Sequence, residues 1–157
     1  MSVQRTMILV WGLALVALTL AAAMQFDRQQ KLADSVVDSQ KEVYIGISTV
    51  VVDVADTSQL HAKGLSGRTS LEPGQGMLFV FEEEGEHGIW MKDMLFSIDI
   101  LWIAGDGTII TIARDVSPDT YPKAFHASRP TAKYVLEVPA GYVDEIGVAV
   151  GDKVVVK

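Results

Sequence analysis

The hydrophobic and polar positions divide the chain into three parts. Residues 7–24 are uncharged and mostly apolar, residues 25–42 are polar, and residues 43–157 alternate short apolar runs with turn-forming residues. A helix over residues 7–24 would be about 27 Å long, close to the ~30 Å hydrocarbon core of a bilayer. We therefore expect an N-terminal transmembrane anchor or signal peptide over 1–24, a polar stalk over 25–42 and a globular domain over 43–157.

The apolar N-terminal run has two interpretations. A cleaved signal peptide would use the alanines at 21–23 as its small-residue site, whereas an uncleaved anchor would keep the helix in the membrane. The length of the run and the lack of a polar break before the alanines favour the anchor. Arg5 opposes Arg28 and Lys31 across the run, so the positive charges do not decide the orientation. We expect the C-terminal domain to be exported, either membrane-anchored or, after cleavage, secreted or periplasmic.

From residue 43 onward the apolar runs have the composition of β-strands. The β-branched run 43–56 predicts one long strand, and further strands are predicted over 77–81, 88–94, 96–103, 108–114, 131–138 and 153–156. The acidic segment 82–87 is expected to be the tip of a hairpin that pairs strands 77–81 and 88–94. The pattern is therefore that of a β-rich domain.

Two short helices and one long loop complete the predicted order. Capping residues at 56–58 precede a helix over 59–63 that Gly64 ends, and a second helix over 139–146 ends at Gly147. Residues 115–130 contain three of the five prolines and show no periodicity. Such a stretch predicts a mobile surface loop that borders a groove.

Composition and charge exclude several classes of function. Residues 43–157 contain nine basic and sixteen acidic side chains, and the whole chain has a formal net charge of -7. Nucleic-acid binding needs a basic surface, so we expect no nucleic-acid partner. The chain has no cysteine, which excludes disulfides, thiolate catalysis and cysteine-ligated zinc.

The motifs of familiar enzymes and cofactor sites are also missing. The three histidines, His61, His87 and His126, show no paired spacing on one element, so no metal site is predicted. The sequence contains no nucleophile elbow, phosphate loop or dinucleotide fingerprint. We therefore expect no cofactor, and the sequence leaves any catalytic residue unknown.

Charged residues within the apolar segment 64–103 mark the candidate site. An ionised group in a buried run must be paired or neutralised. One interpretation is a cleft in which a tryptophan forms an apolar wall and the charged residues make polar contacts. The other is that the charges neutralise one another while the tryptophans fill the core. The candidate binding residues are Arg68, Trp90, Lys92, Asp93 and Asp99.

Asp99 should have a cationic partner, because every neighbour in S-I-D-I-L-W-I except Ser97 is apolar. Arg68 and Lys92 are the cations in the same segment. Arg68 is the expected partner, since its planar guanidinium can hold a carboxylate through two parallel hydrogen bonds and keeps its charge when buried.

Five motifs resemble a bacterial and archaeal family called domain of unknown function 192, or uncharacterised protein family 0127. They are G-L-S-G-R (64–68), G-M-L-F-V-F (76–81), W-M-K-D-M (90–94), I-D-I (98–100) and G-V-A-V-G-D (147–152). The family commonly has Asn and Thr where Asp93 and Met94 stand and a proline where Ser97 stands, so a polar pocket formed there in relatives would be altered here. The resemblance covers residues 43–157 and implies no activity.

With this resemblance, the expected fold is α+β and mostly antiparallel β. It is a compact, partly closed barrel-like sheet with two short helices, preceded by an N-terminal membrane helix.

Three functions are compatible with these features. The first is a membrane-tethered or exported β domain that binds a small molecule or protein partner without chemistry. The second is a cell-envelope hydrolase or lyase with Asp99 and Lys92 as acid/base residues, which would place Asp99 in an open cleft. The third is a structural accessory to a membrane complex, which would expose an apolar patch of several hundred Å². Residues 7–24 provide the membrane contact in each case.

Overall fold

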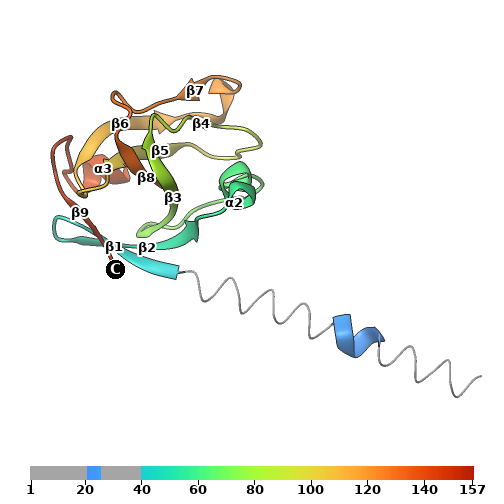
Figure 1. Ribbon diagram of the computed structural model, residues 1–157. Coiled ribbons are helices and arrows are strands. Elements are labelled where there is room, and N and C mark those ends of the chain that lie inside the picture. The colour runs from blue at the N-terminus through green and yellow to red at the C-terminus, as the bar shows by residue number, and fades with distance from the viewer. Residues whose placement is uncertain (1–20, 26–39) are drawn as a thin grey trace, which may run out of the picture. The chain divides into compact units, whose positions relative to one another are not determined.

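A computed structural model describes residues 21–25, which are helical, and residues 40–157, which form a compact β domain (Figure 1). Most of the predicted membrane segment 1–24 and of the stalk 25–42 lies outside the described residues, so both stay predictions. Within the part that is described, no helix has the length and apolar character needed to cross a bilayer. The β domain begins at Gln40 rather than at Val43.

Seven strands form one sheet in the order β6-β5-β8-β3-β2-β1-β9. Neighbouring strands are antiparallel except β2 and β3, which are parallel and are connected through a helix. The strands are β1 (Gln40–Ile45), β2 (Ser48–Ala55), β3 (Gln75–Gly85), β5 (Ile98–Ala104), β6 (Ile109–Val116), β8 (Ala132–Pro139) and β9 (Val154–Val156). A separate ribbon pairs β4 (Ile89–Trp90) with β7 (Ala124–Phe125). The helices are α2 (Ser58–Lys63), the 3-10 turn η1 (Pro118–Thr120) and α3 (Tyr142–Glu145).

The sheet curls until its two edges approach each other. The amide of Ile109 donates to the carbonyl of Asp152 at 2.9 Å, and the amide of Val154 donates to the carbonyl of Gly107 at 2.8 Å. From this closure the chain continues into β9, which pairs with β1, and Figure 1 shows the C-terminus beside β1. The predicted β-rich, partly closed sheet with few short helices is therefore confirmed for residues 40–157.

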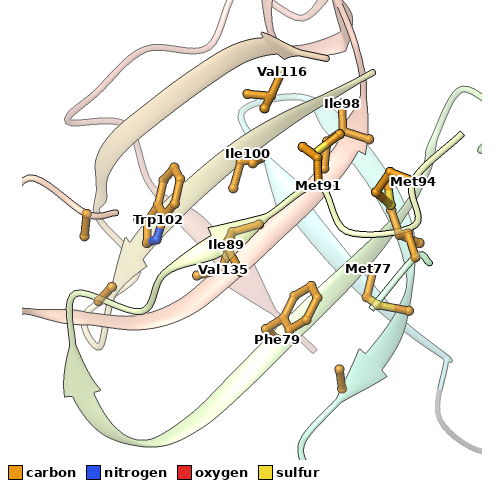
Figure 2. Packing of buried hydrophobic residues seen from close by; sticks show 14 of the residues in the cluster. Met77, Phe79, Ile89, Met91, Met94, Ile98, Ile100, Trp102, Val116 and Val135 are labelled. Carbon is orange, nitrogen blue, oxygen red and sulfur yellow. The ribbon is translucent and has the colours of Figure 1, made fainter. Parts of the chain in front are cut away.

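Both faces of the sheet are buried, which explains why every residue of β5 except Asp99 is apolar. One face packs Leu78, Leu101, Leu136 and other aliphatic side chains inside the curl. The opposite face packs a second cluster beneath the β4–β7 ribbon and its connections, and Figure 2 shows it: Met77, Phe79, Ile89, Met91, Met94, Ile98, Ile100, Trp102, Val116 and Val135. We call this second cluster the outer core. Alternation along a strand places Val135 and Glu137 of β8 on the outer-core face.

The predicted strand 43–56 is wrong at its centre, where the chain turns. Gly46 and Ile47 form a two-residue hairpin loop between β1 and β2, with Ile45 paired to Ser48. Gly46 has φ +61°, the positive value that a tight hairpin requires at this position and that glycine adopts without strain. Ile47 is fully exposed at the tip. Because it is β-branched, the sequence pattern does not distinguish this turn residue from a strand residue.

The predicted hairpin between 77–81 and 88–94 is also wrong. β3 continues to Gly85 and pairs with β8, while β4 pairs with β7. Residues 91–94 are a turn, because the amide of Met94 donates to the carbonyl of Met91 and Asp93 has φ +54°. Trp90 and Met94 consequently do not share a strand face: Trp90 is exposed and Met94 is buried.

The predicted helices and the long loop match more closely. Thr57 caps α2 through its side chain and Gly64 ends it, as expected. The second helix is shorter than predicted and occupies only Tyr142–Glu145. Residues 115–130 contain η1 and β7, and the amide of Ala127 donates to the carbonyl of Glu86. The mobility of this segment stays a prediction.

Candidate functional site

A pocket opens between the end of α2, the loop that follows it, and strands β3, β4 and β8. Its lining comprises His61, Ala62, Lys63, Gly64, Leu65, Ser66, Phe79, Gly88, Ile89, Trp90, Met94 and Glu137. Its free space is about 40 Å³ and opens to solvent, so the pocket admits water-sized groups. We call this space the Glu137 pocket. It suits one small functional group.

Two family-like motifs hold each other beside this pocket. The hydroxyl of Ser66 donates to the carbonyl of Lys92 at 2.8 Å, and the amide of Gly67 donates to the carbonyl of Asp93 at 2.9 Å. Leu65, the residue before Ser66, is buried in the outer core. One side-chain and one backbone hydrogen bond therefore join the G-L-S-G-R loop to the W-M-K-D-M turn, which positions both the wall and the rim of the pocket.

Glu137 is the unusual residue of the pocket. It is 4% exposed, and its Oε2 atom has no hydrogen-bond partner among the described residues. Burial raises the pKa of Glu137 to about 8, although the nearby charge of Arg68 acts in the opposite direction. The carboxyl group is therefore mostly protonated at pH 7 in the unliganded domain. A buried polar group without a partner costs ~1–3 kcal/mol, so this position is not explained by stability.

Arg68 lies on the other side of the same loop and is paired with Asp53. The distance from its Nη2 to Oδ2 of Asp53 is 2.6 Å, and both side chains are partly exposed. A second, polar hollow surrounds this pair and is lined in part by Gln40, Gln75 and Gly76. The predicted pairing of Arg68 with Asp99 is therefore wrong.

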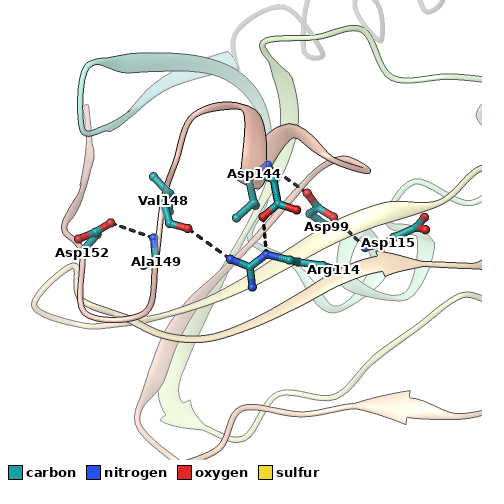
Figure 3. Close-up of polar contacts among 8 residues, drawn as sticks. Asp99, Arg114, Asp115, Asp144, Val148, Ala149 and Asp152 are labelled. Carbon is teal, nitrogen blue, oxygen red and sulfur yellow. Dashed lines mark hydrogen bonds and ion pairs between the residues drawn. The ribbon is translucent and has the colours of Figure 1, made fainter.

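Asp99 is completely buried, and backbone amides satisfy both of its oxygens. Its Oδ1 accepts from the amide of Asp115 at 2.8 Å, and its Oδ2 accepts from the amide of Val143 at 3.1 Å (Figure 3). Val143 lies in the first turn of α3, whose N-cap residue, Gly141, provides no side chain. Asp99 thus serves as the cap of α3 from a distant strand. It fastens α3 and the end of β6 to β5.

Figure 3 shows that polar contacts also hold the loop after α3. The Nε of Arg114 donates to Oδ1 of Asp144 at 2.8 Å, and its Nη2 donates to the carbonyl of Val148 at 3.4 Å. The amide of Ala149 donates to Oδ2 of Asp152 at 2.9 Å. These groups belong to the support of α3 and are not part of the Glu137 pocket.

The five candidate residues do not form one cleft. Trp90 lines the Glu137 pocket and is 50% exposed, whereas Lys92 and Asp93 are exposed in the adjoining turn. Arg68 lies near Glu137 without lining that pocket, and Asp99 is sealed in the interior. Ligand contact by any of them stays a prediction.

Glu137 was missed, although its sequence signal resembles that of Asp99. It is the only charged residue of Y-V-L-E-V-P, and a carboxylate in such a run needs an explanation. His61 also lines the pocket, which the spacing of the three histidines in the sequence does not indicate. Its Nε2 lies 2.9 Å from the carbonyl of Ala55 and 3.1 Å from that of Val80. Within residues 21–25 and 40–157, no cluster of three or more potential metal ligands is found.

Comparison with known proteins assigns the family. Residues 39–156 match the DUF192 family, which is described as an uncharacterized ACR family. The chain belongs to the DUF192 family. The resemblance inferred from the five motifs is therefore confirmed, and the family description assigns no activity.

Two curated DUF192 relatives are UPF0127 proteins of archaea. That of Pyrococcus abyssi is 30% identical over 108 residues, which cover 66% of this chain and 83% of the relative. That of Thermococcus sibiricus is 28% identical over 107 residues, which cover 66% of this chain and 64% of the relative. The matched part thus spans less than two thirds of the Thermococcus protein.

Two crystal structures share the DUF192 fold. A proposed transcription regulator from Sinorhizobium meliloti 1021 is 33% identical with a TM-score of 0.69, over 74% of this chain and 93% of that protein. A protein of unknown function from Novosphingobium aromaticivorans is 29% identical with a TM-score of 0.67, over 74% of this chain and 83% of that protein. These similarities support the curled β domain of Figure 1.

Proposed function

We propose that this chain is a membrane-tethered or exported DUF192 domain that binds a small ligand in the Glu137 pocket. The observation that carries the proposal is the buried carboxyl of Glu137, whose Oε2 lacks a partner among the described residues and which lines an open pocket. Ligand sites typically combine apolar walls with a few polar groups that orient the ligand. Phe79, Leu65 and Ile89 provide such walls here.

Binding fits the pocket better than catalysis does. Glu137 is the one carboxyl group among the described residues that line the pocket, whereas acid/base hydrolysis generally uses two cooperating groups. The hydroxyl of Ser66 and the Nε2 of His61 are already engaged with backbone carbonyls. Asp99, the acid/base candidate, is sealed in the interior with both oxygens occupied. These observations favour recognition without chemistry.

The charge of the domain does not favour a nucleic-acid ligand. Residues 43–157 carry sixteen acidic against nine basic side chains, and sequence-independent DNA affinity depends on phosphate neutralisation by Lys and Arg. A small ligand or the end of a larger one suits a pocket with a free space of about 40 Å³ that opens to solvent.

A pair of matched variants tests ligand binding. Ala62 lines the pocket from α2, whereas Gln59 is exposed on the same helix and lies outside the pocket lining. Ala62→Phe should fill the opening, and Gln59→Phe should leave it free. We expect fragments from a chemically diverse library to raise the melting temperature of the full-length parent and of Gln59→Phe, but not of Ala62→Phe. Fragments that act equally on both variants, or a library without any binder, would contradict the proposal.

A further inference from the structure

The polar side chains that line the Glu137 pocket offer mainly acceptors. The hydroxyl hydrogen of Ser66 is directed to the carbonyl of Lys92, which leaves the Ser66 oxygen able to accept. The Nε2 of His61 faces two carbonyl oxygens, so it carries a hydrogen that they accept. Oε2 of Glu137 has no partner among the described residues, and once the carboxyl group is ionised both of its oxygens only accept. Apart from Lys63 and Trp90, which are both exposed, the lining side chains therefore select a ligand group rich in donors.

The walls of the pocket suit a group that is also positively charged. Phe79 is buried in the lining, and Trp90 stands half-exposed beside it. The faces of aromatic rings attract cations, and tryptophan does so most strongly. A carboxylate together with aromatic faces is a favourable environment for an ammonium group, which has three donors and no acceptor.

The basic residues near the pocket do not oppose the binding of a cation, because each is paired, screened or hydrogen bonded. Arg68 is compensated by its ion pair with Asp53 at 2.6 Å. Lys63 ends α2 and is exposed to solvent, where water and salt screen its charge. His61 packs against Phe79 and Phe81 with its Nε2 hydrogen bonded to the backbone. Glu137 thus remains the deeply buried acidic group of the lining.

We propose that the ligand group held in the Glu137 pocket is a primary alkylammonium, bound by the Glu137 carboxylate and by the oxygen of Ser66, with its carbon chain leaving past Trp90. This inference rests on the proposed ligand-binding function and specifies its chemistry. The free space of about 40 Å³ accommodates the ammonium and the first carbons of the chain. The same group occurs in free amines and at the end of a lysine side chain on another protein.

Binding should be coupled to the release of a proton. The amine arrives as its ammonium form, because its own pKa is ~10.4. Glu137 is mostly protonated before binding, since burial raises its pKa to about 8. It transfers that proton to the solvent when the ammonium enters, so that a carboxylate faces the cation. At pH 7 binding should therefore release a proton from Glu137 to the solvent.

Titration calorimetry on the full-length chain tests the inference with three probes of similar shape. n-Butylammonium should bind at least about tenfold more tightly than n-butanol or butyrate, because the charge-assisted contact to Glu137 is available only to the cation. Repeating the titration in buffers of different ionisation enthalpy measures the proton release. Nα-acetyl-lysine amide distinguishes the two sources: tighter binding than n-butylammonium indicates a lysine side chain, and weaker binding indicates a free amine.

Variants localise the effect. Glu137→Gln should weaken n-butylammonium binding by about tenfold or more and abolish the proton release. Trp90→Ala should weaken it by about threefold, whereas Leu95→Ala, an exposed residue outside the pocket lining, should not. Since Trp90 is exposed, its variant provides a test even if Glu137→Gln does not fold.

Three results would overturn the inference. They are equal binding of n-butanol or butyrate, unchanged binding to Glu137→Gln, and no binding of n-butylammonium. In each case the fragment experiment with Ala62→Phe and Gln59→Phe still decides whether the pocket binds another ligand. Failure of the ammonium inference is thereby separated from failure of the proposed function.

Discussion

Two buried carboxyl groups on adjacent strands, Asp99 of β5 and Glu137 of β8, have opposite surroundings. Asp99 accepts hydrogen bonds from the amides of Asp115 and Val143. Glu137 has an oxygen without a partner among the described residues and lines a pocket. A satisfied buried carboxylate contributes to the fold, whereas an unsatisfied one costs stability. We therefore assign Asp99 to the structure and Glu137 to the site.

Replacing Asp99 should destabilise the domain. Asp99→Asn directs an amide N–H₂ group toward one of the two backbone amides, which leaves a buried donor unpaired and should lower the free energy of unfolding by ~1–3 kcal/mol. Thermal melts of the full-length chain measure this. Asp93→Asn is the matched control, because Asp93 is exposed and asparagine tolerates its positive φ. An Asp99→Asn protein as stable as the parent would contradict the structural role.

Replacing Glu137 should instead change how stability depends on pH. Its folded-state pKa is raised from 4.5 to about 8, so the folded state holds a proton that the unfolded state has lost between these values. Stability of the parent should therefore fall as pH rises from below 4.5 to above 8. Glu137→Gln has no group that titrates here and should not lose stability in this way. Its free energy of unfolding minus that of the parent should therefore increase by up to ~5 kcal/mol between pH 4.5 and about 8, at ~1.4 kcal/mol per pH unit.

Denaturant unfolding at several pH values measures this difference. Glu72→Gln, which replaces an exposed carboxylate, serves as the control and should follow the parent at every pH. Parallel curves for Glu137→Gln and the parent would show that Glu137 ionises as an ordinary surface group.

At the scale of single residues, the sequence identified Asp99 and Trp90 as noteworthy but could not assign their partners. Asp99 is satisfied by two backbone amides that lie 16 and 44 residues away, and backbone amides have no signature in the sequence. Arg68 pairs with Asp53, which lies outside the charged apolar segment 64–103 that marked the candidate site. The signal for Glu137 was present in the apolar run of β8, and recognising it required the same argument that singled out Asp99.

At the scale of elements, local chemistry was predicted well and long-range pairing was not. Thr57 and Gly64 delimit α2 through caps that the local sequence encodes. The parallel pairing of β2 with β3 and the antiparallel pairing of β4 with β7 both depend on contacts between distant segments. The acidic segment after residue 81 resembled a hairpin tip, yet β3 extends through it to Gly85.

The segment 115–130 provides a test at this scale. Its turn hydrogen bonds, such as those of Thr120, Tyr121 and Lys123, lie mostly at exposed positions. We expect these amides to exchange with solvent much faster than those of β5 and β8, because exposed local bonds open without unfolding the core. The amides of Asp115, bonded to the buried carboxylate of Asp99, and of Ala127, bonded to the carbonyl of Glu86, should be protected exceptions. Hydrogen-exchange NMR decides; protection equal to that of the strands would make the segment part of the packed core.

For the whole molecule, the sequence predicts that residues 7–24 bring the chain to a membrane and that the β domain folds without them. The uncharged run supports the first statement, and the separate unit Gln40–Lys157 with its own core supports the second. Membrane fractionation of cells should recover the full-length chain with the membranes, or a shortened mature form if the segment is cleaved. Mass spectrometry of the N-terminus distinguishes the two.

The fragment 40–157, which lacks the apolar run, is the control for the full-length chain in the same fractionation. It should be absent from the membrane fraction and should unfold in one cooperative transition. A full-length chain that retains its N-terminus and is recovered away from membranes would contradict the targeting prediction, and an aggregated or unfolded fragment would contradict the independence of the domain.

The functional proposals depend on the burial of the Glu137 carboxyl, whose Oε2 has no hydrogen-bond partner within residues 21–25 and 40–157. An NMR titration that follows the side-chain carboxyl carbon of Glu137 in the full-length chain tests it most directly. We predict a midpoint near 8, because burial disfavours the ionised form. A midpoint near 4.5, the ordinary value for a glutamate, would contradict the account.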